Sequence, residues 1–185
     1  MVQTAEFASP DAPFRTSRKL RTDTAVGPEA PVQPFPIYLS GPVQRGFGRG
    51  GKDLGCPTAN LPDESLPAMS TVTQTGVYYG YAQVHDAEEG DNAVLPMVMS
   101  LGYNPFYKNK QLTAEIHIMH EFKSDFYGKE MKAVVLGYIR PELDYVSREA
   151  LIEDIEIDKR IAINSLGRCG YEAYKMDPHF ILPKL

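Results

Sequence analysis

The 185-residue sequence has no tryptophan and only two cysteines. Two cysteines cannot build the disulfide framework of a small secreted domain, so we expect a cytoplasmic protein. No stretch reaches the ~18 apolar residues that cross a bilayer, so no membrane span is expected. The net charge of −5 is not that of a general nucleic-acid binder, which presents a broad basic face. We therefore expect small-molecule ligands and, in the absence of a signal for a partner, a monomer.

The first 33 residues are polar and rich in proline, so that neither a helical nor a strand period develops. We expect a disordered extension over residues 1–33, followed by one domain over residues 34–185. Four cations between residues 15 and 21 also suit a mitochondrial presequence, although Glu6 and Asp11 are untypical of one. The sequence leaves that targeting role open.

Five apolar segments are typical of β-strands: residues 37–43, 77–84, 94–101, 112–119 and 132–139. The polar residues 86–92 predict a hairpin between the second and third of them. In the fourth segment the pattern alternates, which places Glu115 and His117 on the face opposite Ile116.

One late helix is predicted over about 147–164, with Ser147 as its N-cap and an apolar stripe at Leu151, Ile155 and Ala162. Residues 61–75, interrupted by two prolines, are predicted to be a surface loop. Strands joined by short turns and a single helix favour a mainly β fold. The prediction is a closed antiparallel barrel rather than a doubly wound α/β sheet.

Residues 41–61, GPVQRGFGRGGKDLGCPTANL, are rich in glycine and carry three cations. Glycine lets backbone N–H groups approach an anion closely, so this stretch predicts a phosphate-binding loop. Two short motifs match it in part. A G-x-G-x-x-G match begins at Gly46 but no helix follows it, and a G-x4-G-K match ends at Lys52 but is followed by Asp53 instead of Ser or Thr. We interpret the stretch as a different kind of nucleotide loop.

The longer pattern G-x-V-x-x-G-x-x-x-G-x-x-x-x-G-x-P-T-A-N, from Gly41 to Asn60, resembles the signature of riboflavin kinases. The segments TGVYYG, SLGYNP, EIHIMH and DFYG follow in the order of that family, and the resemblance spans about 36–163. It is closest to the single-function eukaryotic form. It implies a six-stranded Greek-key barrel that transfers the γ-phosphoryl group of ATP to the 5′-hydroxyl of riboflavin, giving FMN and ADP.

The resemblance also implies which residues lie around ATP: Gly46, Lys52, Thr58, Asn60, Ile118, His120 and Tyr127. Within this set, Thr58 and Asn60 are the implied metal ligands. Their neutral oxygens suit Mg²⁺, and two residues that are two apart share one side of an extended segment. Zn²⁺ or Mn²⁺ stays possible, and residue type alone also allows both side chains to serve turn hydrogen bonds.

Glu115 interrupts an apolar strand, and a carboxylate that faces inward from a sheet is costly unless it is paired or used. The resemblance implies that it lies by the 5′-hydroxyl as a general base or an orienting group. The alternative is a solvent-facing residue on a half-exposed strand. Glu115, His117 and His120 also suggest a zinc site, but His120 falls on the opposite strand face, which argues against it.

For the flavin, the resemblance implies contacts from Arg140, Leu143 and Tyr145. The family often has a basic or polar residue where this chain has Leu143, and a phenylalanine where it has Tyr145. Two other functions stay open. The chain could be a flavin-binding barrel or carrier without catalysis, which would bind flavin without ATP, or a kinase for a different polyol-bearing small molecule.

Overall fold

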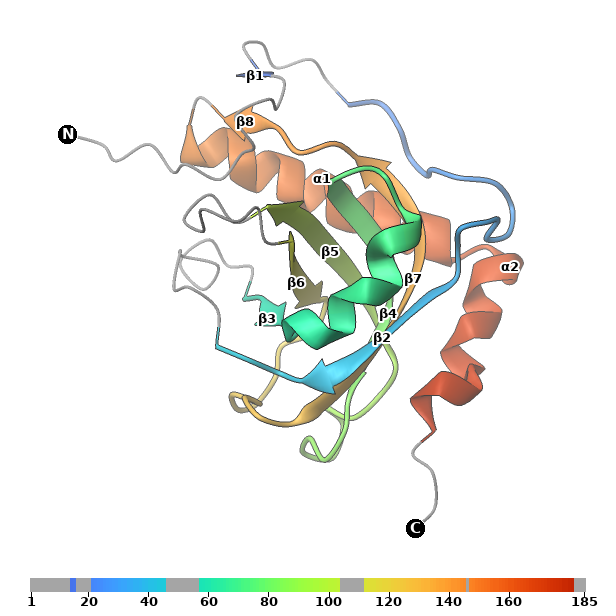
Figure 1. Cartoon of the computed structure of the whole chain (residues 1–185). Coiled ribbons are helices and arrows are strands. Elements are labelled where there is room, and N and C mark those ends of the chain that lie inside the picture. The colour runs from blue at the N-terminus through green and yellow to red at the C-terminus, as the bar shows by residue number, and fades with distance from the viewer. Residues whose placement is uncertain (1–13, 16–20, 46–56, 104–111, 146, 182–185) are drawn as a thin grey trace, which may run out of the picture.

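The structure, a computed structural model, describes residues 14–15, 21–45, 57–103, 112–145 and 147–181. A six-stranded antiparallel sheet curls around an apolar core, and a long helix runs along one outer side of it (Figure 1). The sheet order is β2-β7-β4-β5-β6-β3. The strands are β2 (Ile37–Pro42), β3 (Ala59–Asn60), β4 (Gly76–Val84), β5 (Leu95–Tyr103), β6 (Leu112–Ile118) and β7 (Glu130–Arg140).

The remaining elements are short except for α1. They are the strands β1 (Phe14–Arg15) and β8 (Asp144–Tyr145), the α-helices α1 (Arg148–Leu166) and α2 (Cys169–Glu172), and the 3₁₀-helices η1 (Asp63–Thr71), η2 (Ala173–Met176) and η3 (Pro178–Phe180). None of the helices in the described part of the chain is long and apolar enough to cross a membrane.

The alternating patterns in the sequence predicted the main strands correctly. β4 and β5 form the expected antiparallel hairpin. In β6, Ala114, Ile116 and Ile118 are buried in the core cluster, which leaves Glu115 and His117 on the other face of the sheet. The apolar positions of β6 therefore build the core, while its polar positions are available for a site.

The prediction of a closed barrel is wrong, because the sheet is an open, curled half-barrel. Its edge strands are β2 and β3. Among the described residues, an isolated bridge joins the two edges, in which Gln44 N donates to Asn60 O at 2.8 Å. Prolines 57 and 62 flank β3 and have no N–H to donate to a ladder, which limits the length of this strand. A full hydrogen-bonded seam therefore does not form.

The 3₁₀-helix η1 occupies part of the segment that was predicted to be a surface loop. It contacts both β2 and β6, and its Leu66 and Met69 are buried in the core cluster. Ser65 Oγ donates to Ser40 O of β2 at 2.6 Å. The segment therefore covers the core between the two sides of the curled sheet instead of lying free on the surface.

Helix α1 begins where the sequence predicted. Ser147 is the N-cap, and its Oγ accepts a hydrogen bond from Ala150 N at 3.2 Å. The predicted apolar stripe is only partly right, because Leu151 and Ile155 are half-exposed, whereas the acids Asp154 and Asp158 lie on the buried face. Two charged residues on that face obscured the amphipathic pattern, and both have arginine partners, described below.

The segment before β2 differs from the expected disordered extension. Residues 1–13 and 16–20 lie outside the described residues, but residues 21–33 pack along α1 and α2. Val26 N donates to Ser165 Oγ at 3.0 Å, and Arg168 donates to Val26 O at 2.6 Å and to Gly27 O at 2.9 Å. β1 also pairs in parallel with β8. Hydrogen bonds to groups far along the chain order a segment that has no periodicity of its own.

Candidate active site

The strand pairing brings three of the expected site residues onto one face. Asn60 of β3 lies opposite Glu115 of β6, and Glu115 lies opposite Ser100 of β5. Cα atoms of directly opposed residues are about 4.5–5.5 Å apart, and their side chains share a face. Thr58 precedes Asn60 by two residues in extended chain, so it falls on this face too. The sheet therefore places Thr58, Asn60 and Glu115 side by side.

Glu115 is not directed into the apolar core, which corrects the expectation of an inward-facing carboxylate. It is half-buried on the opposite face, the one it shares with His117. That face is directed toward α1, since the charges of Lys159 and Glu156 on α1 act on His117. Asn60 beside it is buried, with 9% of its surface exposed. The pair thus lies in partial shelter from water at the edge of the sheet.

A cavity of about 390 Å³ opens at this edge of the sheet. Asn60 and Glu115 do not line it, because its strand residues, such as Ala59 and Ile116, belong to the opposite sheet face. The residues before β3, the end of β6 and the loop that follows β6 line it. Among its lining residues are four of those expected around ATP, namely Thr58, Ile118, His120 and Tyr127. Of the other three, Asn60 is not among the lining residues, and Gly46 and Lys52 lie outside the described residues.

The loop after β6 is tied to the turn between β4 and β5. His120 Nε2 and Asp91 Oδ1 are 2.8 Å apart, and Asp91 Oδ2 accepts from Lys123 N at 3.0 Å. The hydrogen bond with His120 is the main reason that the pKa of the Asp91 carboxyl lies below its usual range. The Phe122 ring packs edge-on against His120, with centroids 4.9 Å apart. Asp91 therefore fixes one wall of the cavity.

Asp91 was missed as a functional residue because its neighbours are acids and glycine, and the sequence indicated only a turn. Nothing local distinguishes Asp91 from the other acids in that turn. The signal is the partner 29 residues further along the chain, which only the fold brings near.

An arginine lies at the rim of the cavity, at the start of the glycine-rich stretch. The guanidinium carbon of Arg45 is 4.3 Å from the centroid of the Tyr127 ring. A cation at this distance over an aromatic face is attracted by the ring quadrupole. This contact holds positive charge next to the cavity, where a polyanionic nucleotide would benefit from it.

His117 supports the chain just before Thr58. Its Nδ1 lies 2.8 Å from Pro57 O, a geometry in which the ring N–H donates to the carbonyl. Burial lowers the pKa of His117, and the hydrogen bond to Pro57 opposes this only in part. His117 and His120 thus have different partners, and the described residues contain no cluster of three His, Cys, Asp or Glu side chains that could hold a metal ion.

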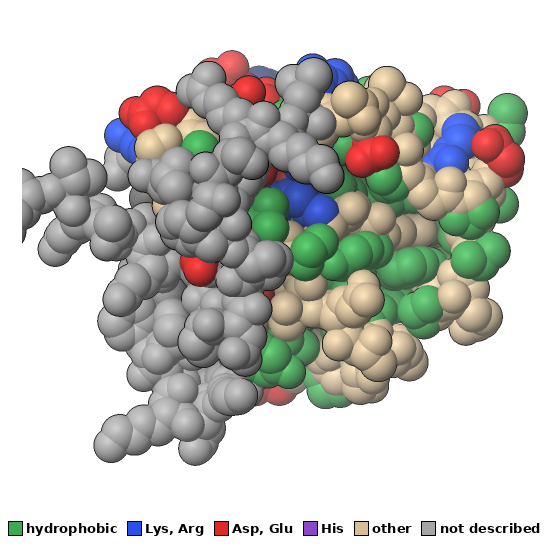
Figure 2. All heavy atoms as spheres, turned by 90° about the horizontal axis from the view of Figure 1, so that it is seen from above, with side chains coloured by type: hydrophobic (Ala, Val, Ile, Leu, Met, Phe, Trp, Pro, Cys, Tyr) green, Lys and Arg blue, Asp and Glu red, His purple; other side chains and the backbone are tan. Residues whose placement is uncertain are grey.

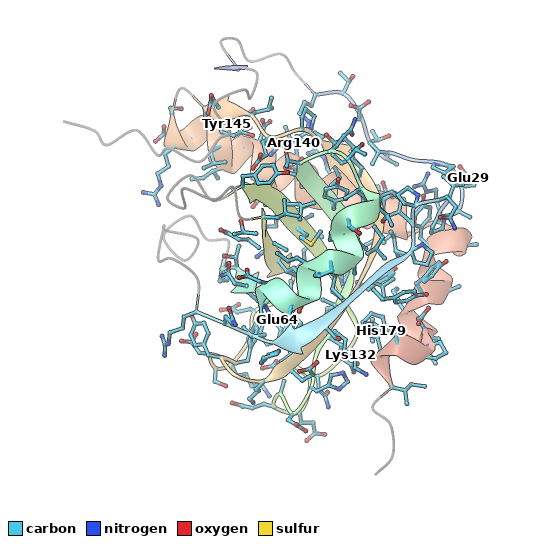
Figure 3. The ribbon with its side chains drawn as sticks, in the orientation of Figure 1. Glu29, Glu64, Lys132, Arg140, Tyr145 and His179 are labelled. Atoms are coloured by element: carbon cyan, nitrogen blue, oxygen red, sulfur yellow. The ribbon has the colours of Figure 1, made fainter. Side chains whose placement is uncertain are left out.

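The residues expected around the flavin form a second group, near the start of α1. Arg140 ends β7, Tyr145 lies in β8, and Leu143 is half-buried in the connection between them. Figure 3 shows Arg140 and Tyr145 close together beside α1, and the guanidinium carbon is 6.0 Å from the Tyr145 ring centroid. In the view from above, hydrophobic side chains gather on the part of this face that grey atoms do not cover, with acidic and basic groups around them (Figure 2).

Two buried acids of α1 hold this group. Asp158 accepts from Arg140 Nε at 3.0 and 3.1 Å and from Arg140 Nη2 at 2.7 Å, and Asp154 Oδ2 accepts from the Tyr145 hydroxyl at 3.0 Å. Burial opposes the charged form of Arg140, but Asp158 outweighs it and raises the arginine pKa. Burial is also the main reason that the pKa of Tyr145 is raised. Tyr145 therefore stays a neutral hydrogen-bond donor at neutral pH.

A further carboxylate covers the same sheet face. A Cβ added at Gly102 would lie 2.2 Å from Oε1 of Glu142, so the glycine makes room for this side chain. Gly102 is two residues from Ser100, which is the partner of Glu115, and the two share a face. Burial raises the pKa of Glu142. The sequence pattern did not single out Glu142.

Comparison with known proteins gives a consistent result. A family model described as "Flavokinase: Riboflavin kinase" matches residues 33–166. The riboflavin kinase of Aspergillus clavatus is 46% identical over an alignment of 188 positions, which covers 82% of this chain and 87% of that protein. The riboflavin kinase of Scheffersomyces stipitis is 44% identical over 84% of this chain and 98% of that protein. The crystal structure of riboflavin kinase from Trypanosoma brucei superposes with a TM-score of 0.65 and 28% identity, over 81% of this chain and 92% of that one.

The mainly β fold and these matches define an ATP-dependent kinase. Within that class, the chain belongs to the riboflavin kinase family.

Proposed function

We propose that the chain transfers the γ-phosphoryl group of ATP to the 5′-hydroxyl of riboflavin, producing FMN and ADP. The observation that supports this most directly is the pairing of Asn60 with Glu115 on one sheet face, two residues along the chain from Thr58, which lines the cavity. Phosphoryl transfer requires neutralised phosphate oxygens and an aligned hydroxyl. The face offers oxygen ligands for the first requirement and a carboxylate for the second.

ATP is the co-substrate, and the cavity is its proposed binding site. Ile118, His120 and Tyr127 would contact the adenine and ribose, and Gly46 and Lys52 the phosphates. The tie between Asp91 and His120 supports this arrangement, because it keeps the cavity wall in one position before the nucleotide arrives. Arg45 adds a cation at the rim.

Thr58 and Asn60 would hold Mg²⁺, which neutralises charge on the phosphate oxygens when it is bound. The residues fit a hard cation, because both offer neutral oxygens and both lie on one face. The main-chain oxygen of Asn60 already accepts from Gln44 N, so its side-chain oxygen is the proposed ligand. Nucleotide oxygens and water would complete the coordination.

Replacing Asn60 by alanine tests the metal assignment. The variant should have a higher ATP KM and should need more Mg²⁺ for half-maximal rate, because one of the two proposed protein ligands is lost. The measurement is the initial rate across a Mg²⁺ titration, with Mn²⁺ and Zn²⁺ titrated in parallel to identify the preferred metal. A titration curve identical to that of the wild type would show that Asn60 is not a ligand.

Glu115 orients the acceptor. Its carboxylate would accept a hydrogen bond from the 5′-hydroxyl of the ribityl chain and align the oxygen with the γ-phosphorus. Because the transition state of phosphoryl transfer is loose, the oxygen need not lose its proton before transfer. Glu115 would then receive the proton as the new bond forms. Arg140, Leu143 and Tyr145 are the proposed flavin contacts.

The decisive experiment mixes the protein with riboflavin and MgATP and separates the flavins by chromatography. FMN should accumulate with an equal amount of ADP. A folded protein that binds riboflavin but forms no FMN would instead be a non-catalytic flavin-binding barrel. Competition by riboflavin against other polyol-bearing acceptors distinguishes the proposed enzyme from a kinase of a different substrate.

We also propose a catalytic domain at residues 34–185, a monomeric state and a cytoplasmic location. The acidic net charge, the low cysteine content and the sequence pattern support these assignments. Light scattering on the purified protein measures the oligomeric state. A fluorescent fusion at the carboxyl terminus tests the location, and mitochondrial fluorescence would assign the first residues to targeting instead.

A further inference from the structure

Two arginines and two aspartates meet next to the proposed flavin contacts. We call Arg21, Arg140, Asp154 and Asp158 the arginine–aspartate cluster. Arg21 Nη1 lies 2.7 Å from Asp158 Oδ1 and 3.8 Å from Asp154 Oδ1. Asp154 and Asp158 are 0% and 2% exposed, and the side chains of Arg21 and Arg140 are 16% and 11% exposed. Two buried carboxylates therefore meet two guanidinium groups of the described residues.

The two acids determine where the proposed flavin contacts lie. Asp158 accepts hydrogen bonds from the guanidinium of Arg140, and Asp154 accepts one from the hydroxyl of Tyr145. The remaining terminal nitrogen of Arg140, Nη1, donates to Pro141 O at 3.0 Å. A shift of either carboxylate would thus move a flavin contact with it.

Arg21 supplies one of these two guanidinium groups. Without it, Asp158 would keep Arg140 as its described cationic partner, and removing one partner of a buried ion pair is strongly unfavourable. The acids would relieve it by turning outward or by sharing Arg140 differently. Either change would displace Arg140 or Tyr145.

The segment that supplies Arg21 reaches the same place a second time. Its residues Phe14 and Arg15 pair with Asp144 and Tyr145, so the backbone that carries Tyr145 forms a two-stranded sheet with it. The family match begins only at residue 33, so both contacts come from outside the matched region. The described structure shows a strap, residues 14–15 and 21–30, that lies outside the residues matched by the family model.

We propose that Arg21 is a positioning residue for the flavin acceptor, acting through Asp154 and Asp158 on Arg140 and Tyr145. This inference rests on the proposed function, because it takes Arg140 and Tyr145 as flavin contacts. It assigns the strap to one substrate: riboflavin binding depends on Arg21, and ATP binding in the cavity beside β6 does not.

The test compares the variants R21Q and R168Q of the full chain. Arg168 ties the same strap to the other end of α1, through Val26 O and Gly27 O, without touching the cluster. R21Q should raise the riboflavin KM and the riboflavin dissociation constant roughly tenfold, while the ATP KM stays within about twofold of the wild type. R168Q should leave both KM values unchanged, even if it lowers the melting temperature.

A charge-balanced double variant completes the test. In R21Q/D154N the cluster keeps one carboxylate and one guanidinium, and the amide introduced in place of Asp154 still offers an oxygen to Tyr145. The riboflavin KM should return to within about threefold of the wild type. If R21Q alone does not fold, the double variant decides, since it should fold and bind riboflavin.

Three results would overturn the proposal: an unchanged riboflavin KM in R21Q, an equal rise of both KM values, or the same selective effect in R168Q. A double variant no better than R21Q would remove the charge-balance argument and with it the proposal. Riboflavin binding is measured by quenching of flavin fluorescence without ATP. Failure of the inference therefore stays separate from failure of the proposed function, which wild-type FMN formation tests.

Discussion

The nucleotide side and the flavin side of the proposed site are held in different ways. On the nucleotide side, His120 is 30% exposed and is tied to the fold through Asp91 of a surface turn. On the flavin side, Asp154 and Asp158 are almost fully buried and bind two arginines. Asp91 is itself only 5% exposed, so both sides depend on a buried carboxylate, and breaking a buried pair is expensive. The nucleotide wall is therefore held by one pair with a partly exposed histidine, and the flavin side by two buried acids with two arginines.

Glu115 lies where the two sides meet, and its replacement should have the largest effect. Glu115→Gln keeps the shape of the side chain but removes the charge that aligns the hydroxyl. We expect kcat to fall by a factor on the order of 10²–10⁴, with the ATP KM little changed. Steady-state kinetics measure kcat and the ATP KM of the variant. Ser100→Ala, at the neighbouring position on β5, is the control, and an unchanged kcat in Glu115→Gln would refute the assigned role.

Asp158→Asn tests the flavin side. It leaves Arg21 and Arg140 with Asp154 alone as a buried counter-charge, so the free energy of unfolding should fall by about 3–5 kcal/mol. Glu156→Gln on the same helix is the matched control, because its ion pair with Lys159 is at the surface and should contribute less than about 0.5 kcal/mol. Urea denaturation followed by circular dichroism measures both. Equal losses in the two variants would remove the contrast between the sides.

Asp91→Asn tests the nucleotide side. The loss of the charged hydrogen bond to His120 should raise the ATP KM about three- to tenfold and leave the riboflavin KM unchanged. Glu89→Gln changes an exposed acid of the same turn that accepts from Lys123 through its backbone oxygen, and should alter neither KM. If Asp91→Asn raises both KM values together, the two sides are coupled and the comparison fails.

The smallest effect concerns pH. Burial lowers the pKa of His85 and of His117, so the folded protein binds these protons more weakly than the unfolded chain, in which histidine titrates near 6.5. Stability should therefore be constant above about pH 6.5 and decrease as the pH falls below it, by at most about 1.4 kcal/mol per pH unit for each histidine. Melting temperatures from pH 8 to pH 5 measure this. His85→Gln should flatten the decrease, and an unchanged slope would exclude His85 as a source.

The parts of this protein that could be predicted from sequence are those that local patterns determine. Alternation in residues 112–119 predicted which side chains of β6 reach the core, and Ser147 marked the start of α1. The long glycine pattern and the EIHIMH segment indicated Thr58, Asn60 and Glu115, which the sheet places on one face. In each case the information lies within a few residues of the feature.

The parts that could not be predicted depend on partners far apart in the chain. The strap looked disordered because its hydrogen bonds come from α1 and α2. The predicted apolar stripe of α1 did not include Asp154 and Asp158, because acids are usually exposed. Asp91 looked like one more acid in a turn. The sequence predicted a closed barrel, but the sheet stays open. The extent of pairing between β2 and β3 depends on two prolines and on how far the sheet curls.

The hydrogen bond between Gln44 and Asn60 has a further consequence for the glycine-rich stretch. It joins the two ends of that stretch, so the fold itself has already met the entropic cost of bringing them together. The entropic cost of closing a chain segment rises only with the logarithm of its length, about 0.6 kcal/mol for each doubling. Insertions or deletions between Gln44 and Asn60 should therefore cost the fold little, so that the length of this stretch can vary in evolution almost independently of stability.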